Sequence, residues 1–366
     1  MDRVDREWLG EALQLARRGA GETWPNPQVG AVIVKDGVKI GEGWHAVAGG
    51  PHAEVNAVAS CVSSPRGATI YVTLEPCSTQ GRTPPCSRLI IESGIRRVVA
   101  GCSDPNPRHA GRGYEVLRAA GVEVSDGCRE EECKELIAPF AKRLQHGLPY
   151  VTLKLAMTLD GKIADRNGRS KWITGPAARD EVQELRRRTD GVMVGGGTIM
   201  ADDPSLLCRA PRVKQQRLRI IIGGGGCLLR SAQVFSDESG GRVIVCIAEE
   251  DLPRLEGELA EVIHKVEILP FAAIQGRISL SEVMKRLADE GLTHILCEGG
   301  GALAGGLIEA GLVDECVMFY APAVMGDNRA VSGVAGTDLL LDEMPRFELV
   351  ESHEAGSDVV VRVRRR

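Results

Sequence analysis

Three side chains with metal-binding chemistry, His52, Cys77 and Cys86, lie close together in the sequence, and Glu54 follows the histidine two positions later. One imidazole and two thiolates suit a catalytic zinc site, in which a water takes the fourth tetrahedral position and its pKa falls to about 7. Positions i and i+2 lie about 200° apart on a helix, so Glu54 would not share a metal-facing side with His52. The pattern therefore predicts a zinc site with Glu54 free to move protons.

Each of these residues has a plainer interpretation when taken alone. A single histidine beside a glutamate is usually a surface or hydrogen-bonded core residue, and isolated cysteines usually behave as small buried hydrophobes. Their positions favour the metal site, because Pro51 marks a helix start at His52 and Pro84-Pro85 mark another at Cys86. The dipole of a helix N-terminus stabilises the thiolate that a metal needs.

The H-x-E pattern with a later P-C segment is shared with the zinc deaminases that act on nucleobases, where the glutamate is a proton shuttle and not a ligand. Those enzymes usually close the ligand set with C-x-x-C. Here eight residues separate Cys77 from Cys86. The longer spacing indicates a particular branch of such enzymes.

Length and composition indicate a globular protein of two domains. The chain has 366 residues and a formal net charge of −5, so its overall field does not favour a nucleic-acid partner. Eleven cysteines without a disulfide-like spacing suit a reducing compartment. The first residues have no apolar signal core, and no apolar run approaches the roughly 20 residues of a membrane span. We therefore expect a soluble, cytoplasmic protein without a membrane partner.

The amino half alternates apolar β-rich runs with helical patterns, which predicts a layered α/β sheet whose strands are parallel after a first hairpin. The expected helices and strands, in chain order, are a helix over 5–18, a strand over 29–34, a helix from His52, a strand over 69–74, a helix from Cys86, a strand over 96–100, a helix over 114–120, a strand over 122–124 and a charged helix over 129–144. Gly147-Leu148-Pro149 is the expected linker.

The carboxyl half repeats the alternation, with expected strands over 151–157, 191–194, 218–222, 242–247 and 294–298 and expected helices over 176–188 and 301–310. Glycine clusters end three of these strands, at 195–197, 223–226 and 299–301. Glycine after a buried strand lets backbone N–H groups approach a phosphate, although each cluster taken singly is more often a tight turn. Three clusters on one sheet bring the two interpretations about level. None of them has the G-x-G-x-x-G spacing of a standard dinucleotide site, so the residues alone leave a nucleotide cofactor open.

Over nearly its full length the chain resembles the bifunctional deaminase/reductase family of riboflavin biosynthesis. The amino half carries the motifs PNPQVG (25–30), GWH (43–45), PHAEV (51–55), LEPC (74–77), GRTPPC (81–86) and DPNP (104–107). The carboxyl half carries KLAMTLDGKI (154–163), SKWITG (170–175), GTIMADDP (197–204), EGG (298–300) and Ala321-Pro322.

The resemblance implies an α/β protein of two three-layer αβα domains, cytidine-deaminase-like over 1–146 and dihydrofolate-reductase-like over 148–366. The first domain would hold one zinc ion on His52, Cys77 and Cys86, with Glu54 as the catalytic proton shuttle. It would release ammonia from the 2-amino group of 2,5-diamino-6-ribosylamino-4(3H)-pyrimidinone 5′-phosphate. Asn26 and His45 would shape the substrate pocket.

The second domain would use NADPH to reduce the ribosyl group, giving 5-amino-6-(5-phosphoribitylamino)uracil. By motif match, the cofactor contacts would be Ala156, Trp172, Thr198, Asp202, Gly300, Gly301, Ala302, Leu303, Ala304, Gly305 and Gly306. The substrate contacts would be Ser170, Arg186, Leu206, Arg209 and Glu298, and the two arginines suit a sugar phosphate because guanidinium binds phosphate in a bidentate manner. The partner implied is thus a small phosphorylated pyrimidine, and we expect a homo-oligomer.

The chain departs from the family pattern at three places. Ser78-Thr79-Gln80 stand where a histidine is frequent, Gln183 replaces another histidine, and Gly223-Gly224-Gly225-Gly226 replace a usual aspartate. The first two departures bear on substrate contacts, and the third bears on the preference for NADPH over NADH.

Two rival functions stay open at this point. In one, the deaminase is active and the second domain is a degenerate partner, a reading that the run of four glycines motivates. In the other, the chain is a binding protein whose zinc is structural. A nucleic-acid deaminase fits less well, since no basic aromatic groove is evident.

Overall fold

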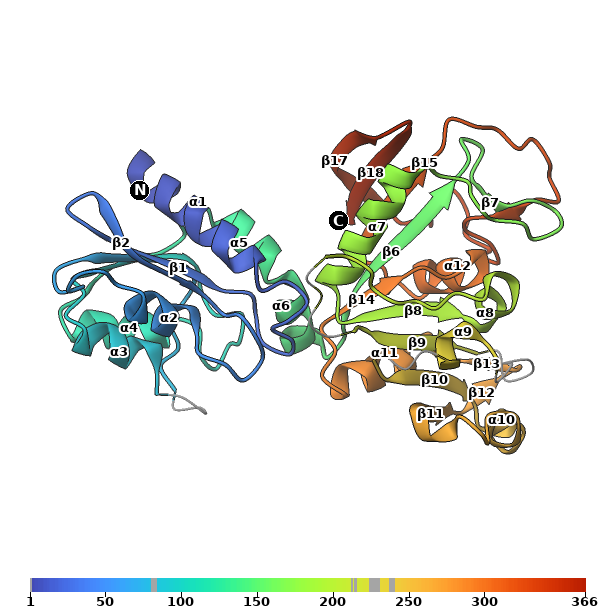
Figure 1. Cartoon of the computed structure of the whole chain (residues 1–366), viewed down its shortest axis with the longest axis horizontal. Helices are drawn as coiled ribbons and strands as arrows, with labels where there is room; N and C mark the ends of the chain where they lie inside the picture. The colour runs from blue at the N-terminus through green and yellow to red at the C-terminus, as the bar shows by residue number, and fades with distance from the viewer. Residues whose placement is uncertain (1, 80–83, 212, 214–215, 224–230, 237–240) are drawn as a thin grey trace. The chain divides into compact units, whose positions relative to one another are not determined.

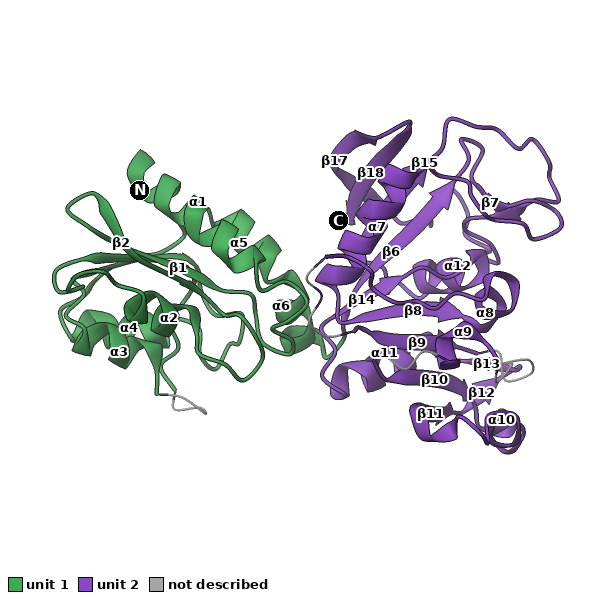
Figure 2. Ribbon diagram, viewed as in Figure 1, with its two compact units in different colours: residues 1–148 green, residues 149–366 purple. Residues whose placement is uncertain are grey.

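The structure is a computed structural model that describes residues 2–79, 84–211, 213, 216–223, 231–236 and 241–366. It divides into two compact units, residues 1–148 and 149–366 (Figures 1 and 2). Gln80, Gly224, Gly225 and Gly226, named above as departures from the family pattern, lie outside the described residues, as do Gly81, Arg82 and Thr83 of the GRTPPC motif.

Unit 1 is built on a five-stranded sheet in the order β2-β1-β3-β4-β5. Its elements are α1 (Arg3–Arg17), β1 (Gly30–Lys35), β2 (Val38–Trp44), α2 (Ala53–Ala59), β3 (Thr69–Leu74), α3 (Cys86–Glu92), β4 (Arg97–Cys102), α4 (Arg112–Ala119), β5 (Glu123–Ser125), α5 (Glu130–Leu136) and α6 (Ala138–His146). Strand β1 is antiparallel to β2 and β3, whereas β3, β4 and β5 are parallel. This is the predicted hairpin followed by parallel strands.

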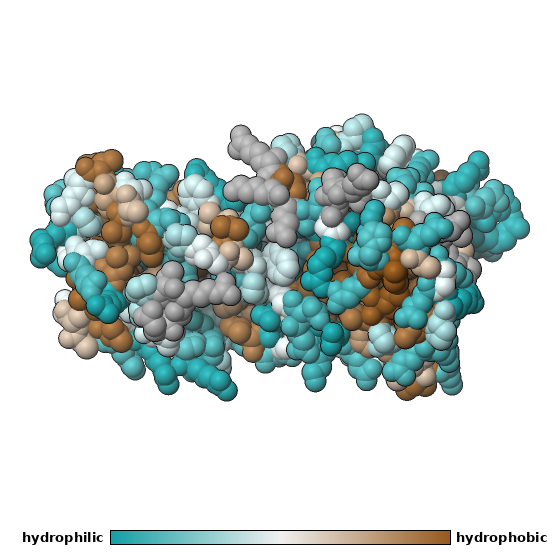
Figure 3. Space-filling model, turned by 60° about the horizontal axis from the view of Figure 1, so that its bottom comes forward, coloured by the Kyte–Doolittle hydropathy of each residue, from teal (hydrophilic) through white to brown (hydrophobic). Residues whose placement is uncertain are grey.

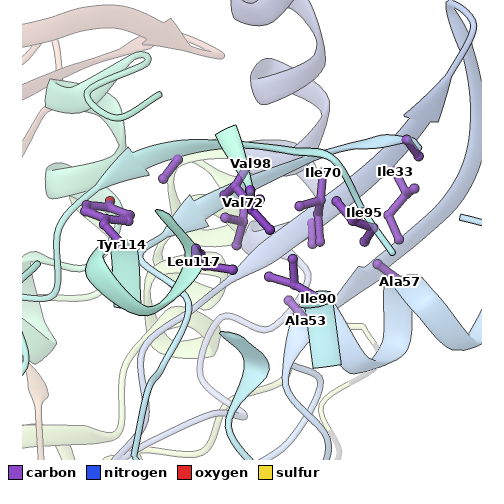
Figure 4. Close-up of a cluster of buried hydrophobic side chains, with 14 of the residues drawn as sticks. Ile33, Ala53, Ala57, Ile70, Val72, Ile90, Ile95, Val98, Tyr114 and Leu117 are labelled. Atoms are coloured by element: carbon purple, nitrogen blue, oxygen red, sulfur yellow. The ribbon is translucent and has the colours of Figure 1, made fainter. Parts of the chain in front are cut away.

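Alternation along the strands of unit 1 sends side chains to opposite faces of the sheet. Ile33 joins a core with α2, α3 and α4 (Figure 4), and its neighbour Val32 joins a second core with α1 and α5. Helix α1 is also fixed by Asp5, whose buried carboxylate accepts two bonds from the Arg97 guanidinium at 2.8 and 2.9 Å. Unit 1 therefore has the predicted three-layer arrangement.

Unit 2 contains a nine-stranded sheet in the order β11-β10-β9-β8-β14-β6-β15-β18-β17. Its elements are β6 (Tyr150–Met157), β7 (Lys162–Ala164), α7 (Pro176–Arg188), β8 (Gly191–Gly195), α8 (Gly196–Asp202), β9 (Leu218–Ile222), α9 (Gln233–Ser236), β10 (Val243–Ala248), η1 (Glu249–Asp251), α10 (Leu252–Glu258), η2 (Ile263–Lys265), β11 (Val266–Phe271), β12 (Ala273–Ile274), β13 (Arg277–Ile278), α11 (Leu280–Asp289), β14 (His294–Cys297), α12 (Gly301–Glu309), β15 (Glu315–Tyr320), β16 (Val331–Ser332), β17 (Phe347–Ala355) and β18 (Asp358–Arg365).

The strands of the large sheet from β11 to β15 are parallel to their neighbours, and β18 and β17 continue it as an antiparallel hairpin. One core lies between β8, β9, β10 and the helices α8, α9 and α10. Helix α7 packs a second core on β15 and β18 through Ala178 and Val182. Because the central strands are parallel, the carboxyl ends of β6, β8 and β14 lie at one edge of the sheet, where ligands of such sheets usually bind.

One predicted element is wrong, and several strands were not predicted. The single helix expected over 129–144 is broken at Ile137, where α5 ends and α6 begins with Pro139 in its first turn. Proline has no N–H to donate to the preceding turn, so it begins a helix more readily than it continues one. Strands β11, β15, β17 and β18 of the large sheet were not predicted.

The surface of the chain mixes polar and apolar residues. Figure 3 shows brown hydrophobic residues interspersed among teal hydrophilic ones on the face that it displays. Among the described residues, no helix is both long enough and apolar enough to cross a bilayer.

Candidate active sites

The three predicted metal ligands of unit 1 meet in the folded chain. His52 is the N-cap of α2, Cys77 follows the carboxyl end of β3, and Cys86 is the first residue of α3. The Nδ1 atom of His52 lies 3.6 Å from the Cys77 sulfur and 3.3 Å from the Cys86 sulfur. The ligand atoms of all three residues lie within 4.8 Å of one another.

These spacings fit a zinc ion. Zn–S bonds of about 2.3 Å and Zn–N bonds of about 2.0–2.1 Å, set at tetrahedral angles, place nitrogen and sulfur about 3.6 Å apart. The two observed N···S distances are within a few tenths of an ångström of that value. The backbone N–H of Cys86 also donates to the Cys77 sulfur at 3.3 Å, which supports a thiolate there.

The charges of the cluster also suit a cation. The hydrogen bond from Cys86 lowers the pKa of Cys77 to about 4, and the same contact raises the pKa of Cys86, because the second negative charge would lie against the first. A divalent cation among the two sulfurs removes this conflict, since coordinated thiols lose their protons. The donor set therefore favours a bound metal.

Glu54 lies in the first turn of α2, is only 3% exposed and interacts with Cys77 and Cys86 of the cluster. Burial raises the pKa of Glu54 to about 7, and the charge of Cys77 adds to this rise. A carboxyl group that titrates near neutral pH can both accept and release a proton under working conditions. The carboxylate is thus turned toward the three ligands and has the protonation chemistry of a shuttle.

The two predicted substrate residues of unit 1 lie beside the same cluster. The His45 ring meets the His52 ring edge-on at 5.7 Å, and its Nδ1–H donates to the carbonyl oxygen of Pro51 at 2.9 Å. Burial lowers the pKa of His45, which favours the neutral ring. Because Nδ1 carries the proton, Nε2 accepts from the Asn26 amide at 3.2 Å. Asn26 is therefore oriented by His45, which is itself held by Pro51, and Pro51 directly precedes the predicted ligand His52.

Unit 2 contains a cavity of about 630 Å³ at the carboxyl ends of β6, β8 and β14, a volume typical of small-molecule sites. The structure brings together there ten of the residues that the sequence predicted for cofactor or substrate, namely Ala156, Ser170, Trp172, Arg186, Thr198, Asp202, Leu206, Arg209, Glu298 and Gly300. Residues 301–306 of α12 are not part of this lining. Residues predicted to contact the cofactor and residues predicted to contact the substrate thus line one cavity.

A buried ion pair forms one wall of the cavity. Arg186 on α7 donates through Nε and Nη2 to the two Glu298 oxygens at 2.6 and 3.0 Å, and through Nη1 to the Leu207 carbonyl at 2.8 Å. The two side chains are 10% and 11% exposed. Since guanidinium has five N–H donors, these bonds leave two of them for a ligand. Arg186 accordingly organises the cavity and retains limited capacity to bind.

Other predicted residues are tied to one another around the cavity mouth. Ser170 donates to the Asp202 carboxylate at 2.6 Å, and Thr198 accepts the Gly300 backbone N–H at 3.2 Å. Trp172 is 69% exposed, and the Arg179 guanidinium lies 4.6 Å from its ring centroid. An exposed indole with a cation on one face is a ready stacking surface for an aromatic ligand.

The glycines of α12 are explained partly by packing within the chain. A side chain on Gly301 would meet the Ser332 carbonyl at 2.2 Å, and one on Gly305 would meet the Ala335 carbonyl at 2.1 Å. These two positions let the backbone at 332–335 pass close to the helix. Their expected contact with cofactor phosphates stays a prediction.

Two departures from the family pattern fall on described residues of unit 2. Gln183 lines the cavity, and its side-chain oxygen accepts the Arg209 backbone N–H at 2.7 Å. It therefore holds the segment that carries Arg209 and Leu206. Gly223 has a φ of +69° and open space around it, so a glycine suits this turn.

Sequence reasoning missed two charged residues of the sites. Lys154 lines the cavity, and burial lowers its pKa while the nearby Glu298 charge opposes that shift. Its signal was a lysine within the otherwise apolar strand 151–157. Glu75, in the LEPC motif, is 5% exposed and accepts three backbone N–H groups. Its signal was a carboxylate directly after a buried strand.

The fold and sites define the class: a cytidine-deaminase-type zinc domain joined to an α/β domain whose cavity has the volume of a small-molecule site. Residues 2–102 match the family described as "Cytidine and deoxycytidylate deaminase zinc-binding region", and residues 149–361 match the "RibD C-terminal domain".

Similar proteins extend over the whole chain. The Riboflavin biosynthesis protein RibD of Escherichia coli (strain K12) is 39% identical over 97% of this chain and 98% of its own length. That of Actinobacillus pleuropneumoniae is 40% identical over 98% of this chain and 94% of its own. The structure of Acinetobacter baumannii RibD (form 1) superposes with a TM-score of 0.87 and 36% identity, covering 100% of this chain and 99% of that one.

The chain therefore belongs to the RibD family, and it is a bifunctional deaminase/reductase of riboflavin biosynthesis with both domains present. The resemblance and fold class expected from the sequence are confirmed. The rival in which the chain is only a zinc-stabilised binding protein loses its support.

Proposed function

We propose that unit 1 releases ammonia from the 2-amino group of 2,5-diamino-6-ribosylamino-4(3H)-pyrimidinone 5′-phosphate, and that unit 2 then reduces the ribosyl group of the product with NADPH. We assign the first activity to residues 1–146 and the second to 148–366. The observation that carries the proposal is the meeting of His52, Cys77 and Cys86 with the buried carboxyl group of Glu54 turned toward them.

In unit 1 the roles follow from position and charge. His52, Cys77 and Cys86 hold zinc, which when bound supplies a Lewis acid that makes water nucleophilic at neutral pH. Glu54 would accept one proton from the attacking water and pass it to a ring nitrogen, and would then take the remaining hydroxyl proton of the adduct and give it to the leaving amine, so that ammonia departs and the carbonyl forms. With a pKa of about 7, its carboxyl group is suited to both directions of transfer. Asn26, oriented by His45, borders the pyrimidine.

In unit 2 the cavity residues bind and orient two ligands. NADPH supplies the hydride. Trp172 offers a stacking surface at the mouth, and Ala156, Thr198, Asp202 and the start of α12 at Gly300 lie along the same cavity. The remaining segment, residues 301–306, is proposed for the cofactor phosphates by motif match alone.

The residues proposed for the substrate of unit 2 line the same cavity. Ser170, Leu206, Arg209 and the Arg186–Glu298 pair line it, and the uncommitted N–H groups of the arginines suit the sugar phosphate. Lys154, which has a lowered pKa, adds a proton donor close to Glu298. These residues would place the opened ribosyl carbon for hydride transfer and keep water from it.

The test is to give the purified, zinc-loaded chain each substrate separately. Ammonia should be released from the diamino compound without any NADPH, and NADPH should be oxidised only with the deaminated compound. Arg186→Met should lose the oxidation and keep ammonia release, whereas Cys86→Ser should do the reverse. Ammonia release without any NADPH oxidation would instead support a degenerate second domain. A homo-oligomer and a cytoplasmic location stay predictions, which sedimentation and cell fractionation would check.

A further inference from the structure

Glu75 joins two segments of unit 1 that are distant in the sequence. Its Oε2 atom accepts the backbone N–H groups of Asp104 and Gly111 at 3.0 and 2.9 Å, and its Oε1 atom accepts that of Gly113 at 2.8 Å. Gly111 is the N-cap of α4, and Gly113 lies in the first turn of that helix. The carboxylate therefore supplies the capping group that α4 lacks locally, and the helix dipole favours its charge.

The same contact places the 104–113 segment directly on the metal-binding turn. A side chain on Gly113 would meet the Pro76 carbonyl oxygen at 2.1 Å, so the two backbones are packed as closely as glycine permits. Pro76 immediately precedes the ligand Cys77, whose carbonyl accepts the Ser87 N–H at 3.1 Å at the start of α3. Glu75 thus lies between the Cys77 turn and the start of α4.

The segment held by Glu75 begins with a second carboxylate, Asp104. Desolvation raises the pKa of Asp104, and the charges of Glu75 and Cys77 add to the rise. Its Oδ1 atom accepts the Asn106 N–H at 2.8 Å, which fixes its rotamer. Leu74 of β3 pairs with Cys102 of the parallel strand β4, so Asp104 follows the end of β4 at the same edge of the sheet where Cys77 follows the end of β3. A carboxylate at this edge is an acceptor for the N–H donors of a diaminopyrimidine.

We propose that Glu75 is a positioning residue for the deamination, which holds the 104–113 segment against the Cys77 turn so that Asp104 faces the bound pyrimidine. The inference rests on the function proposed for unit 1. It assigns Glu75 no contact with substrate or metal. A carboxylate is needed because an amide of the same shape has only one accepting oxygen and would turn its NH₂ toward a backbone N–H.

The test compares Glu75→Gln with the parent enzyme, both as zinc-loaded full chains. We expect kcat/KM for ammonia release to fall about tenfold or more, with KM carrying much of the change. Zinc should stay at one per chain, and NADPH oxidation by unit 2 should be unchanged, which controls for general damage. Glu115→Gln, which neutralises an exposed carboxylate on α4, is the matched control and should leave both activities intact.

A double-mutant cycle separates positioning from simple stability. Asp104→Asn should raise KM, and Glu75→Gln/Asp104→Asn should be no worse than Asp104→Asn alone, because Glu75 acts through that residue. Additive effects would overturn the proposal. So would a Glu75→Gln chain that loses zinc and thermal stability while its activity per bound zinc is unchanged.

Two further outcomes are distinguishable. If Glu75→Gln does not fold, Gly113→Ala replaces it in the cycle, since its added carbon displaces the same segment and leaves the carboxylate in place. It should show the same non-additivity with Asp104→Asn, and additivity would count against the proposal. Absence of ammonia release in the parent enzyme would sink the proposed function itself, whereas full activity in Glu75→Gln would sink only this inference.

Discussion

Breaking the Arg186–Glu298 ion pair should destabilise unit 2 strongly. Its guanidinium and carboxylate are joined by two bonds of 2.6 and 3.0 Å, and both side chains are about nine-tenths buried. Removing one partner of such a pair leaves a buried charge without compensation, which costs about 3–5 kcal/mol. Because this pair borders a cavity that water can enter, we expect the lower end, about 3 kcal/mol, for Glu298→Gln.

The assay is thermal unfolding of the full chain by calorimetry, followed at the transition of unit 2. For a unit of this size 1 kcal/mol shifts the midpoint by about 2–4 °C, so Glu298→Gln should lower it by about 6–12 °C. Arg254→Gln is the control, because the Arg254–Glu258 pair lies on the surface with the arginine 52% exposed, and such pairs contribute below about 1 kcal/mol.

Removing both charges of the pair together should cost far less stability than removing one of them. Replacing both partners with methionine removes both charges and keeps much of the volume, so Arg186→Met/Glu298→Met should unfold close to the parent temperature. The reasoning is refuted if Glu298→Gln shifts the midpoint no more than Arg254→Gln. It is equally refuted if the double variant is as unstable as either single one.

Three other perturbations have defined outcomes. Burial opposes the charge of Asp5, but the bonds and charge of Arg97 outweigh it and hold the pKa of Asp5 below the usual range of an aspartate. The pair therefore stabilises unit 1 at pH values above that usual range, and this stabilisation is lost as the pH falls. Asp5→Asn should flatten the acid limb of a stability–pH curve, and an unchanged limb would contradict this. Lys154→Met should reduce kcat/KM for NADPH oxidation about 10–100-fold by removing a charged donor from the cavity, with ammonia release unaffected, and equal loss of both activities would argue against a local role. Chelation of zinc should abolish ammonia release reversibly and lower the unfolding temperature of unit 1 alone, and a parallel loss of NADPH oxidation would show that the metal serves both units.

Elements with strong local signals were predictable from the sequence. Strand β3 coincides with the expected range 69–74, since its apolar run is bounded by turn residues. The helix over 129–144 was wrong because its periodicity is continuous, and only Pro139 marks the break into α5 and α6. Strands β17 and β18 went unnoticed because most of their side chains are exposed or half-buried, which leaves little apolar alternation.

The site residues also divide into those with a local motif and those that depend on long-range contacts. Residue types and spacing were enough to single out His52, Cys77 and Cys86, which meet in the structure, and Glu54 beside them, because each motif is local and its chemistry is narrow. Contacts between residues distant in the sequence could not be predicted in this way. Nothing near Arg186 in the sequence identifies Glu298 as its partner. Nor does a motif show that Glu75 caps α4 or that Gln183 holds the Arg209 backbone, since these are long-range contacts between a side chain and the main chain.

The central claim is tested most directly by Glu54→Gln in the full chain. The account predicts that this isosteric variant keeps one zinc per chain and full NADPH oxidation, and loses ammonia release by a factor of about 10²–10⁴, the usual contribution of a general acid–base group. Ammonia release at the parental rate with zinc still bound would contradict it.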